Sequence, residues 1–230
     1  MEKEQILNAL KSIKEDSQKR NFKQRVDLII TIMGIDLKKP ENKIDLYVQL
    51  HHDKGKKTRI CGLVGPELLE NSKKYFDATV SSDEFSRGLD KKKLKAIARE
   101  NDFFVAQVNV MPQVATSFGK ILGPLGKMPN PKAGCVVTPN SNLSQLAEKL
   151  QTTIRINIQK QPLVQTTVGS EDDDPEKVAD NILVVYNSLL HALPGEKNNI
   201  RAVYLKLTMG KPIKIGTKQE DAPVKQKGKQ

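Results

Sequence analysis

Tryptophan is absent from this chain of 230 residues, which also has only two cysteines, three histidines and 4% aromatic residues. Cys61 and Cys135 are too few for a cysteine-rich zinc site or a disulfide scaffold, and the histidines lack metal-ligand spacing. So few aromatic rings also argue against a broad stacking platform for single-stranded nucleic acid. We therefore expect no metal, no cofactor and a reducing compartment, the cytoplasm.

Long apolar runs are missing as well. No stretch of about 18 apolar residues occurs, so we expect no membrane-spanning helix and no membrane partner. The first residues, Met-Glu-Lys-Glu-Gln, lack the apolar core of a signal peptide. Hydrophobic residues make up 37% of the chain, which is enough for one large or two ordinary folded domains.

Negative charge is in the minority. Thirty-eight Lys and Arg against 27 Asp and Glu give a net charge of +11. A chain this basic commonly binds a polyanion, although excess lysine can also serve solubility alone. The excess is concentrated in residues 56–156, with 16 basic and 9 acidic side chains, whereas residues 1–55 and 157–230 each carry 11 and 9.

Two kinds of hydrophobic pattern divide the chain. Near both ends apolar and polar residues alternate, as in residues 26–32 and 154–158, which predicts strands with one buried face. The middle alternates short apolar strands with helices, which is typical of βαβ units and a largely parallel sheet. We therefore predict a two-domain α/β and α+β protein: a split α+β domain of residues 1–55 and 157–230, interrupted by an inserted α/β domain of residues 56–156.

Residues 117–134, the signature segment, contain four glycines and three prolines, so we expect that neither a helix nor a strand runs through them. A phosphate-binding P-loop around Gly126-Lys127 would need a glycine where Ile121 stands and a hydroxyl where Met128 stands. A rigid solvated loop is the simpler alternative. The candidate binding residues of this segment are Gly119, Lys120, Gly123, Pro124, Gly126, Lys127, Pro129 and Pro131.

Four separate segments resemble one known family, in its archaeal form. They are the signature segment, the basic and aromatic segment 19–28, the helical Ala-Asp-Asn-Ile of residues 179–182, and the closing segment 201–210, which ends in Thr-Met-Gly. In this order they span almost the whole chain, and they resemble the ribosomal protein L1 family, the stalk proteins of the large ribosomal subunit.

The resemblance implies a split RNA-binding domain and a Rossmann-like inserted domain of three layers. It also implies a structural protein of a 50S-type large subunit, monomeric when free, that binds large-subunit rRNA. The bound rRNA forms the mobile stalk involved in release of deacylated tRNA from the exit site, and the same surface binds the protein's own mRNA to repress translation. The residues that the resemblance assigns to RNA binding are Lys19, Arg20, Phe22, Gln24, Asp27, Thr208, Met209, Gly210 and Lys211.

Several alternatives stay open. Phe22 near a strand start could belong to a core, and family members commonly have Ser or Thr where this chain has Arg25. We expect the Thr208 hydroxyl to face outward with few protein partners. A nucleotide-using enzyme is the second functional hypothesis, but residues 62–65 (Gly-Leu-Val-Gly) do not fit the Gly-x-Gly-x-x-Gly turn, and no nucleophile motif occurs. We therefore expect no enzymatic activity and no catalytic residue.

Overall fold

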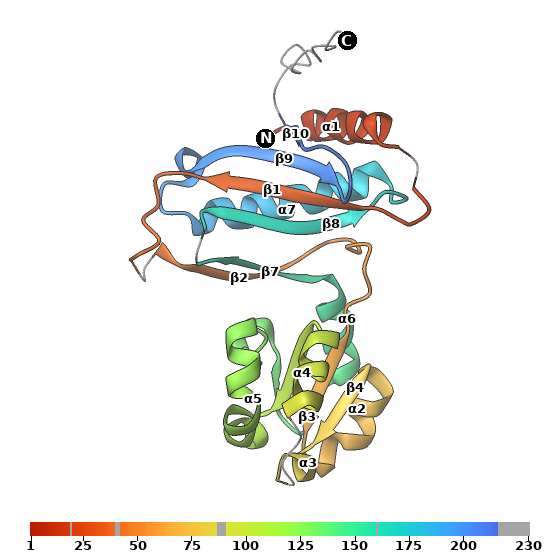
Figure 1. The fold of residues 1–230 in the computed structure, drawn as a ribbon, viewed down its shortest axis with the longest axis vertical. Coiled ribbons are helices and arrows are strands. Elements are labelled where there is room, and N and C mark those ends of the chain that lie inside the picture. Colours follow the sequence, from red (N-terminus) through yellow and green to blue (C-terminus); the bar gives the residue numbers. More distant parts are fainter. Residues whose placement is uncertain (19, 40–41, 87–90, 160, 216–230) are drawn as a thin grey trace, which may run out of the picture. The chain divides into compact units, whose positions relative to one another are not determined.

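The structure is a computed structural model that describes residues 1–18, 20–39, 42–86, 91–159 and 161–215. The chain divides into two compact units (Figure 1): residues 1–55 together with residues from 156 onward form the first unit, and residues 56–155 form the second. The first unit contains an antiparallel sheet and the second a parallel sheet, so the predicted mixed α/β and α+β fold class is confirmed.

A four-stranded antiparallel sheet in the order β10-β9-β1-β8 forms the centre of the first unit. Along the central strand β1, Val26, Leu28, Ile30 and Ile32 are buried, while the residues between them are more exposed, as the alternating pattern predicts. The sheet therefore has one face on the core and one open face. Its strands are β1 (Arg25–Ile32), β8 (Leu163–Ser170), β9 (Ile200–Leu207) and the short β10 (Ile213–Lys214).

Two helices cover the buried face of this sheet. α1 (Lys3–Asp16) packs against β9, β10 and α7, and α7 (Pro175–Ala192) packs against β8 (Figure 1). The sequence encodes the start of α7: the Asp174 carboxylate accepts a hydrogen bond from the Glu176 N–H, and Pro175 occupies the first turn. A carboxylate and a proline are both favourable there, because the first N–H groups of a helix have no partner within it.

A buried asparagine fastens residues 50–55, the segment that leads from the first unit to the second. Asn181 is 1% exposed, and its Oδ1 accepts a hydrogen bond from the His52 N–H at 3.0 Å. Its Nδ2 donates to the carbonyls of His52 and Asp53 at 3.3 Å and of Val168 at 2.9 Å. This fully used amide explains why α7 buries an asparagine. Nearby, β2 packs against α7; the strands β2 (Ile44–Gln49) and β7 (Thr153–Ile158) form a separate two-stranded sheet.

The second unit has a parallel sheet in the order β4-β3-β5-β6 with helices on both faces. α2 and α6 pack together on one face, and α3, α4 and α5 lie on the other, where the rings of Phe85 and Phe118 meet edge to face at 5.3 Å. The strands are β3 (Ile60–Val64), β4 (Ala78–Ser81), β5 (Phe103–Gln107) and β6 (Val136–Val137). The helices are α2 (Leu69–Tyr75), α3 (Ser82–Ser86), α4 (Lys91–Glu100), α5 (Met111–Leu125) and α6 (Leu143–Thr152).

The expectation that no helix runs through the signature segment is wrong for residues 117–125, whereas residues 126–134 contain no α-helix or strand. α5 continues to Leu125 with Pro124 inside its last turn, and Gly126, at φ 67°, ends it in the left-handed conformation. The helix forms because Val114, Phe118 and Leu122 are fully buried at helical spacing, and this burial outweighs the low helix propensity of the glycines. A proline this near the end removes only one helical hydrogen bond.

Candidate nucleic-acid interface

The end of β9 is joined to the start of β1, its neighbour in the middle of the first unit's sheet. This end of the sheet, where β9 stops and β1 begins, is called the edge below. The Thr208 N–H donates to the Arg25 carbonyl at 3.1 Å, and the Arg25 N–H donates to Thr208 Oγ1 at 3.0 Å. The turn of residues 208–210 is thereby fixed to β1. The expectation that the Thr208 hydroxyl has few protein partners is wrong, because this oxygen completes the last step of the strand pairing.

Gln24 lies beneath the turn rather than on its surface. Its side chain is 1% exposed, and its Oε1 accepts a hydrogen bond from the Met209 N–H at 3.3 Å. The Gln24 carbonyl accepts from the Glu171 N–H at 3.0 Å, so the residue also joins the end of β8. The Gln24 side chain therefore positions the turn and is not itself available for direct contact with RNA, contrary to the prediction.

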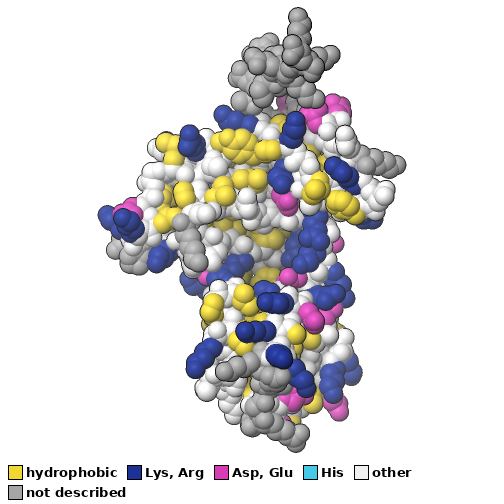
Figure 2. Space-filling view, in the orientation of Figure 1, with side chains coloured by type: hydrophobic (Ala, Val, Ile, Leu, Met, Phe, Trp, Pro, Cys, Tyr) yellow, Lys and Arg dark blue, Asp and Glu magenta, His cyan; other side chains and the backbone are white. Residues whose placement is uncertain are grey.

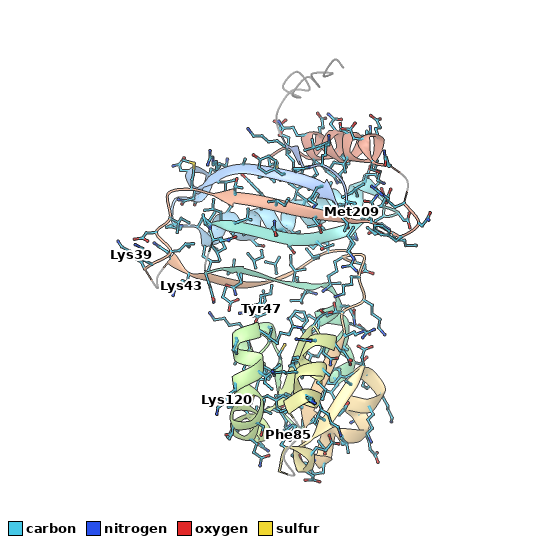
Figure 3. All side chains as sticks on the ribbon, in the orientation of Figure 1. Lys39, Lys43, Tyr47, Phe85, Lys120 and Met209 are labelled. Atoms are coloured by element: carbon cyan, nitrogen blue, oxygen red, sulfur yellow. The ribbon has the colours of Figure 1, made fainter. Side chains whose placement is uncertain are left out.

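Met209 is the most exposed large apolar side chain described in the first unit. It is 63% exposed, although its own N–H is bonded to the buried Gln24 (Figure 3). The Gly210 N–H donates to the Leu207 carbonyl at 2.9 Å and closes the turn. A Cβ at Gly210 would lie 3.3 Å from the Leu207 Cβ, which is a tight contact. A rigid main chain thus presents an adaptable apolar side chain to solvent.

Asp27 lies on the open face of the sheet, next to the turn. Its Oδ1 accepts a hydrogen bond from Thr167 Oγ1 on β8 at 2.9 Å, and it stands directly opposite Lys206 on β9. Among the described residues, no hydrogen bond to the second oxygen of this carboxylate is found, and such an oxygen can accept from a donor such as a ribose hydroxyl.

The other residues predicted for RNA binding lie on segments next to the turn. Phe22 is 52% exposed, so it is not a core residue, and Arg20 and Lys211 are also exposed. Arg25 is exposed as well, and only its main chain is used in the bonds to Thr208. Lys19 lies outside the described residues.

Acidic groups balance the cations at this edge. Lys23 and Asp172 form an ion pair at 3.0 Å, and this hydrogen bond raises the pKa of Lys23. With 82% and 63% of the two side chains exposed, the pair contributes little stability. The Ser170 N–H donates to Asp173 Oδ2 at 2.7 Å, so part of the acidic run is structural. Bulk positive charge therefore does not distinguish this edge, and any specificity here would have to come from shape and hydrogen bonds.

Lys127 of the signature segment has a structural role within the second unit. Its Nζ donates to the Ala98 carbonyl at 2.9 Å and to the Asn101 carbonyl at 2.7 Å, where α4 ends. An ammonium at this position satisfies carbonyls that have no partner within the helix and is favoured by the macrodipole. Burial lowers the pKa of the ammonium, and nearby Asp102 opposes this effect. These contacts account for Lys127 without a bound phosphate.

The remaining signature residues divide into an exposed and a packed group. Gly119, Lys120, Gly123 and Pro124 lie on α5 toward solvent, and a Cβ at either glycine would meet no atom within 4 Å. Lys120 is labelled in Figure 3. By contrast, the Gly126 carbonyl accepts a hydrogen bond from the Arg155 guanidinium. Pro129 is buried, whereas Pro131, which opens a short 3-10 turn, is exposed.

The place where a Rossmann-like sheet binds a ligand is filled in the second unit. In the order β4-β3-β5-β6, β4 lies on one side of β3 and β5 on the other, so the strand order switches between β3 and β5, and their carboxyl ends would form the crevice. Gln107, 2% exposed, occupies this position: its Oε1 accepts from the Gly65 N–H at 2.9 Å, and its Nε2 donates to Glu67 at 3.3 Å. The backbone N–H that a phosphate would need is therefore already bonded, which disfavours nucleotide binding.

Neither cysteine has the properties of a reactive or metal-binding thiol. Burial raises the pKa of Cys61 to about 12 and that of Cys135 to about 11, so both remain protonated at neutral pH. Within the described ranges, no cluster of three or more His, Cys, Asp or Glu side chains is placed to hold a metal ion. In the same part of the chain, no helix has both the length and the apolar character needed to span a membrane.

Sequence reasoning missed the supporting residues of the interface. Thr167 and Lys206 flank Asp27, and Ser170 donates to the Gln24 carbonyl at 3.4 Å. A local signal existed for Lys206, which alternates with buried Leu205 and Leu207 and therefore belongs on the open face. Nothing local links Ser170 to Gln24, since 146 residues separate them.

Taken together, the basic composition, the fixed and exposed turn, and the filled ligand crevice are typical of a nucleic-acid-binding protein. Residues 10–211 match the ribosomal protein L1p/L10e family, and the chain belongs to that family. Its relatives are ribosomal proteins, a family not known to be enzymatic, which confirms the prediction that the chain is not an enzyme.

Individual relatives cover nearly the whole chain and are mostly archaeal, as the sequence predicts. The large ribosomal subunit protein uL1 of Nanoarchaeum equitans is 39% identical over 87% of this chain and 94% of its own length. The protein of the same name from Methanothermococcus thermolithotrophicus is 37% identical over 94% of this chain and 99% of its own. That from Methanocaldococcus jannaschii is 36% identical over 98% of this chain and 100% of its own.

Proposed function

We propose that this chain is a structural constituent of the large ribosomal subunit, in the cytoplasm, that binds large-subunit rRNA through the edge of its first unit. The observation that carries this proposal is the turn of residues 208–210. Its main chain is bonded to Arg25 and Gln24, while Met209 is 63% exposed. A folded RNA is recognised by shape, backbone and 2′-hydroxyl contacts, which require such fixed groups.

Asp27, Phe22, Gly210 and the nearby cations complete the proposed interface. Asp27 supplies an acceptor for a ribose hydroxyl or a guanine edge, and Phe22 a flat apolar surface. The absence of a side chain at Gly210 lets RNA approach the main chain closely. Arg20 and Lys211 are both exposed, and their positive charges would contact phosphates.

Two finer roles follow from the same proposal. In the subunit, the bound rRNA would form the mobile stalk that assists release of deacylated tRNA from the exit site. An mRNA segment that folds like the rRNA site would bind the same edge, because this edge reads shape rather than a long base sequence. The protein would then repress its own translation. Competition between rRNA and the 5′ region of its own mRNA for the protein tests that second role.

Replacement of Met209 by alanine tests the main proposal. Burying a whole methionine contributes about 1.5–3 kcal/mol, and the exposed part of Met209 could contribute about 1–2 kcal/mol against RNA. Affinity for a large-subunit rRNA fragment should fall about 5- to 30-fold. The melting temperature should not change, because the side chain is 63% exposed in the free protein.

Met33→Ala is the matched control. Met33 is 51% exposed and belongs to the same unit, and its main chain is also bonded, to Asn199. It follows the other end of β1, away from the proposed interface. Affinity should be unchanged in this variant. Equal affinities for both variants and the unaltered protein would reject the assignment of the interface to the turn.

A further inference from the structure

α4 carries a row of cations on its exposed side in the second unit. Leu94 and Ala98 are 5% and 0% exposed and face the core. At about 100° per residue, Lys92, Lys95 and Arg99 lie together on the opposite side, at successive turns of the helix. All three are exposed. This row, the α4 stripe, is about 10 Å long.

The helix macrodipole does not explain these charges. The first turn of α4, Lys91–Leu94, contains three lysines and no acidic residue. Positive charge there faces the positive end of the helix macrodipole and is unfavourable. Only Arg99, in the last turn, is placed where a cation stabilises the helix.

The surroundings of the stripe are strongly positive. The second unit has 16 basic and nine acidic residues, a net charge of +7. Figure 2 shows Lys and Arg side chains gathered on the face of this unit where α4 lies in Figure 1. Glu100 follows Arg99 but points about 100° away around the helix. A phosphate strand is the charge complement of such a row.

We propose that the α4 stripe binds the sugar-phosphate backbone of large-subunit rRNA without reading base sequence. The inference rests on the proposed function and adds a second, non-specific contact surface to it. RNA fits better than a protein partner, because the exposed side of α4 offers cations and Ala96 but no aromatic or large apolar anchor of the kind that protein interfaces use. Such a contact would raise affinity and its dependence on salt, while the first unit supplies specificity.

The test compares two full-length triple variants with equal charge. One carries Lys92→Gln, Lys95→Gln and Arg99→Gln. The control removes three exposed lysines from α2 and α6, which pack on the other face of the sheet. The control substitutions are Lys73→Gln, Lys74→Gln and Lys149→Gln.

Affinity for an rRNA fragment that holds the specific site and flanking double helix is measured between about 50 and 200 mM salt. For the stripe variant, the slope of log affinity against log salt should fall by about one for each phosphate that the protein no longer neutralises. The control should retain the slope of the unaltered protein. Equal reductions in both variants would show a long-range charge effect, and an unchanged slope in the stripe variant would show that α4 does not touch RNA; either result overturns the inference.

Specificity distinguishes this inference from the proposed function. The preference of the stripe variant for the rRNA fragment over random RNA should remain as in the unaltered protein. If the unaltered protein itself shows no such preference, the proposed function fails, whatever the salt slopes. Thermal melting verifies that the triple variant folds, and the single variant Lys95→Gln, with an expected slope change of about one, replaces it otherwise.

Discussion

Replacement of Lys127 by methionine separates the two roles that the sequence left open for this residue, phosphate binding and a structural contact. Methionine keeps a flexible apolar stem but cannot donate a hydrogen bond. In the variant, the carbonyls of Ala98 and Asn101 lose the ammonium that lies 2.9 and 2.7 Å from them. Because Ala98 and Asn101 are 0% and 3% exposed, water has little access to replace it.

The expected loss of stability follows from these two hydrogen bonds. A hydrogen bond to a charged group contributes about 1.5–3 kcal/mol, and a cation at a helix C-terminus adds about 0.3–1 kcal/mol. Lys127 is itself only half-buried, which reduces the net contribution, so we expect a loss of about 2 kcal/mol for both bonds together. In a unit of about 100 residues, each 1 kcal/mol shifts the melting temperature by about 4–8 °C. The second unit should therefore melt about 10 °C lower.

Calorimetry of the full-length protein measures this shift, and hydrogen exchange localises it to the end of α4. Lys120→Met is the control: Lys120 is exposed on α5, and its replacement should leave melting unchanged. Affinity for rRNA per folded molecule should be unaltered by Lys127→Met. Normal melting combined with weaker RNA binding would refute the reasoning, since it would mean that Lys127 leaves the carbonyls to bind phosphate.

Two further predictions concern the second unit. Gly119→Ala should raise its stability by about 0.5–1 kcal/mol in thermal melts, because a Cβ there meets nothing within 4 Å. Gly123→Ala should gain less or lose stability, since the following proline disfavours helical backbone at a residue with a Cβ; an equal gain would contradict this account. Burial would raise the pKa of Asp77, but the hydrogen bond from the Ile60 N–H and the ion pair with Lys57 lower it below 3.8. The unaltered protein should therefore be more stable than Asp77→Asn at pH 7, and the difference should disappear as the pH falls through the lowered pKa; a difference that persists in acid would exclude the charge as its cause.

The proposed interface shows why part of a site is beyond local sequence reasoning. The resemblance of these segments to a known family indicated Thr208, Met209 and Gln24, but it did not indicate what each side chain does. Thr208 bonds to Arg25 and Met209 to Gln24 across 183 and 185 residues of sequence. Whether a polar side chain faces RNA or holds the turn depends on this pairing, which no local pattern contains.

In the signature segment a local pattern was present, but tertiary packing overrides the conformation that it predicts. Its glycines and prolines favoured a loop, yet burial of Val114, Phe118 and Leu122 extends α5 through residue 125. A glycine in a helix costs about 1 kcal/mol relative to alanine, and Pro124 lies in the last turn, while each buried side chain contributes about 1.5–3 kcal/mol. Tertiary packing therefore decides the conformation wherever the two disagree.

What the sequence by itself determined is the class of several segments and the overall chemistry. The alternation of apolar and polar residues indicated β1. The helical spacing of apolar residues and the Asp174-Pro175 pair at the start encode α7. The excess of basic residues indicated a polyanionic partner. These signals are either local in the sequence or sums over the whole chain, so they can be recognised from the sequence alone. The tertiary structure alone decided that Lys127 supports α4, that Gln24 is buried and that Met209 is exposed, because these outcomes depend on which distant groups meet and which are left to water.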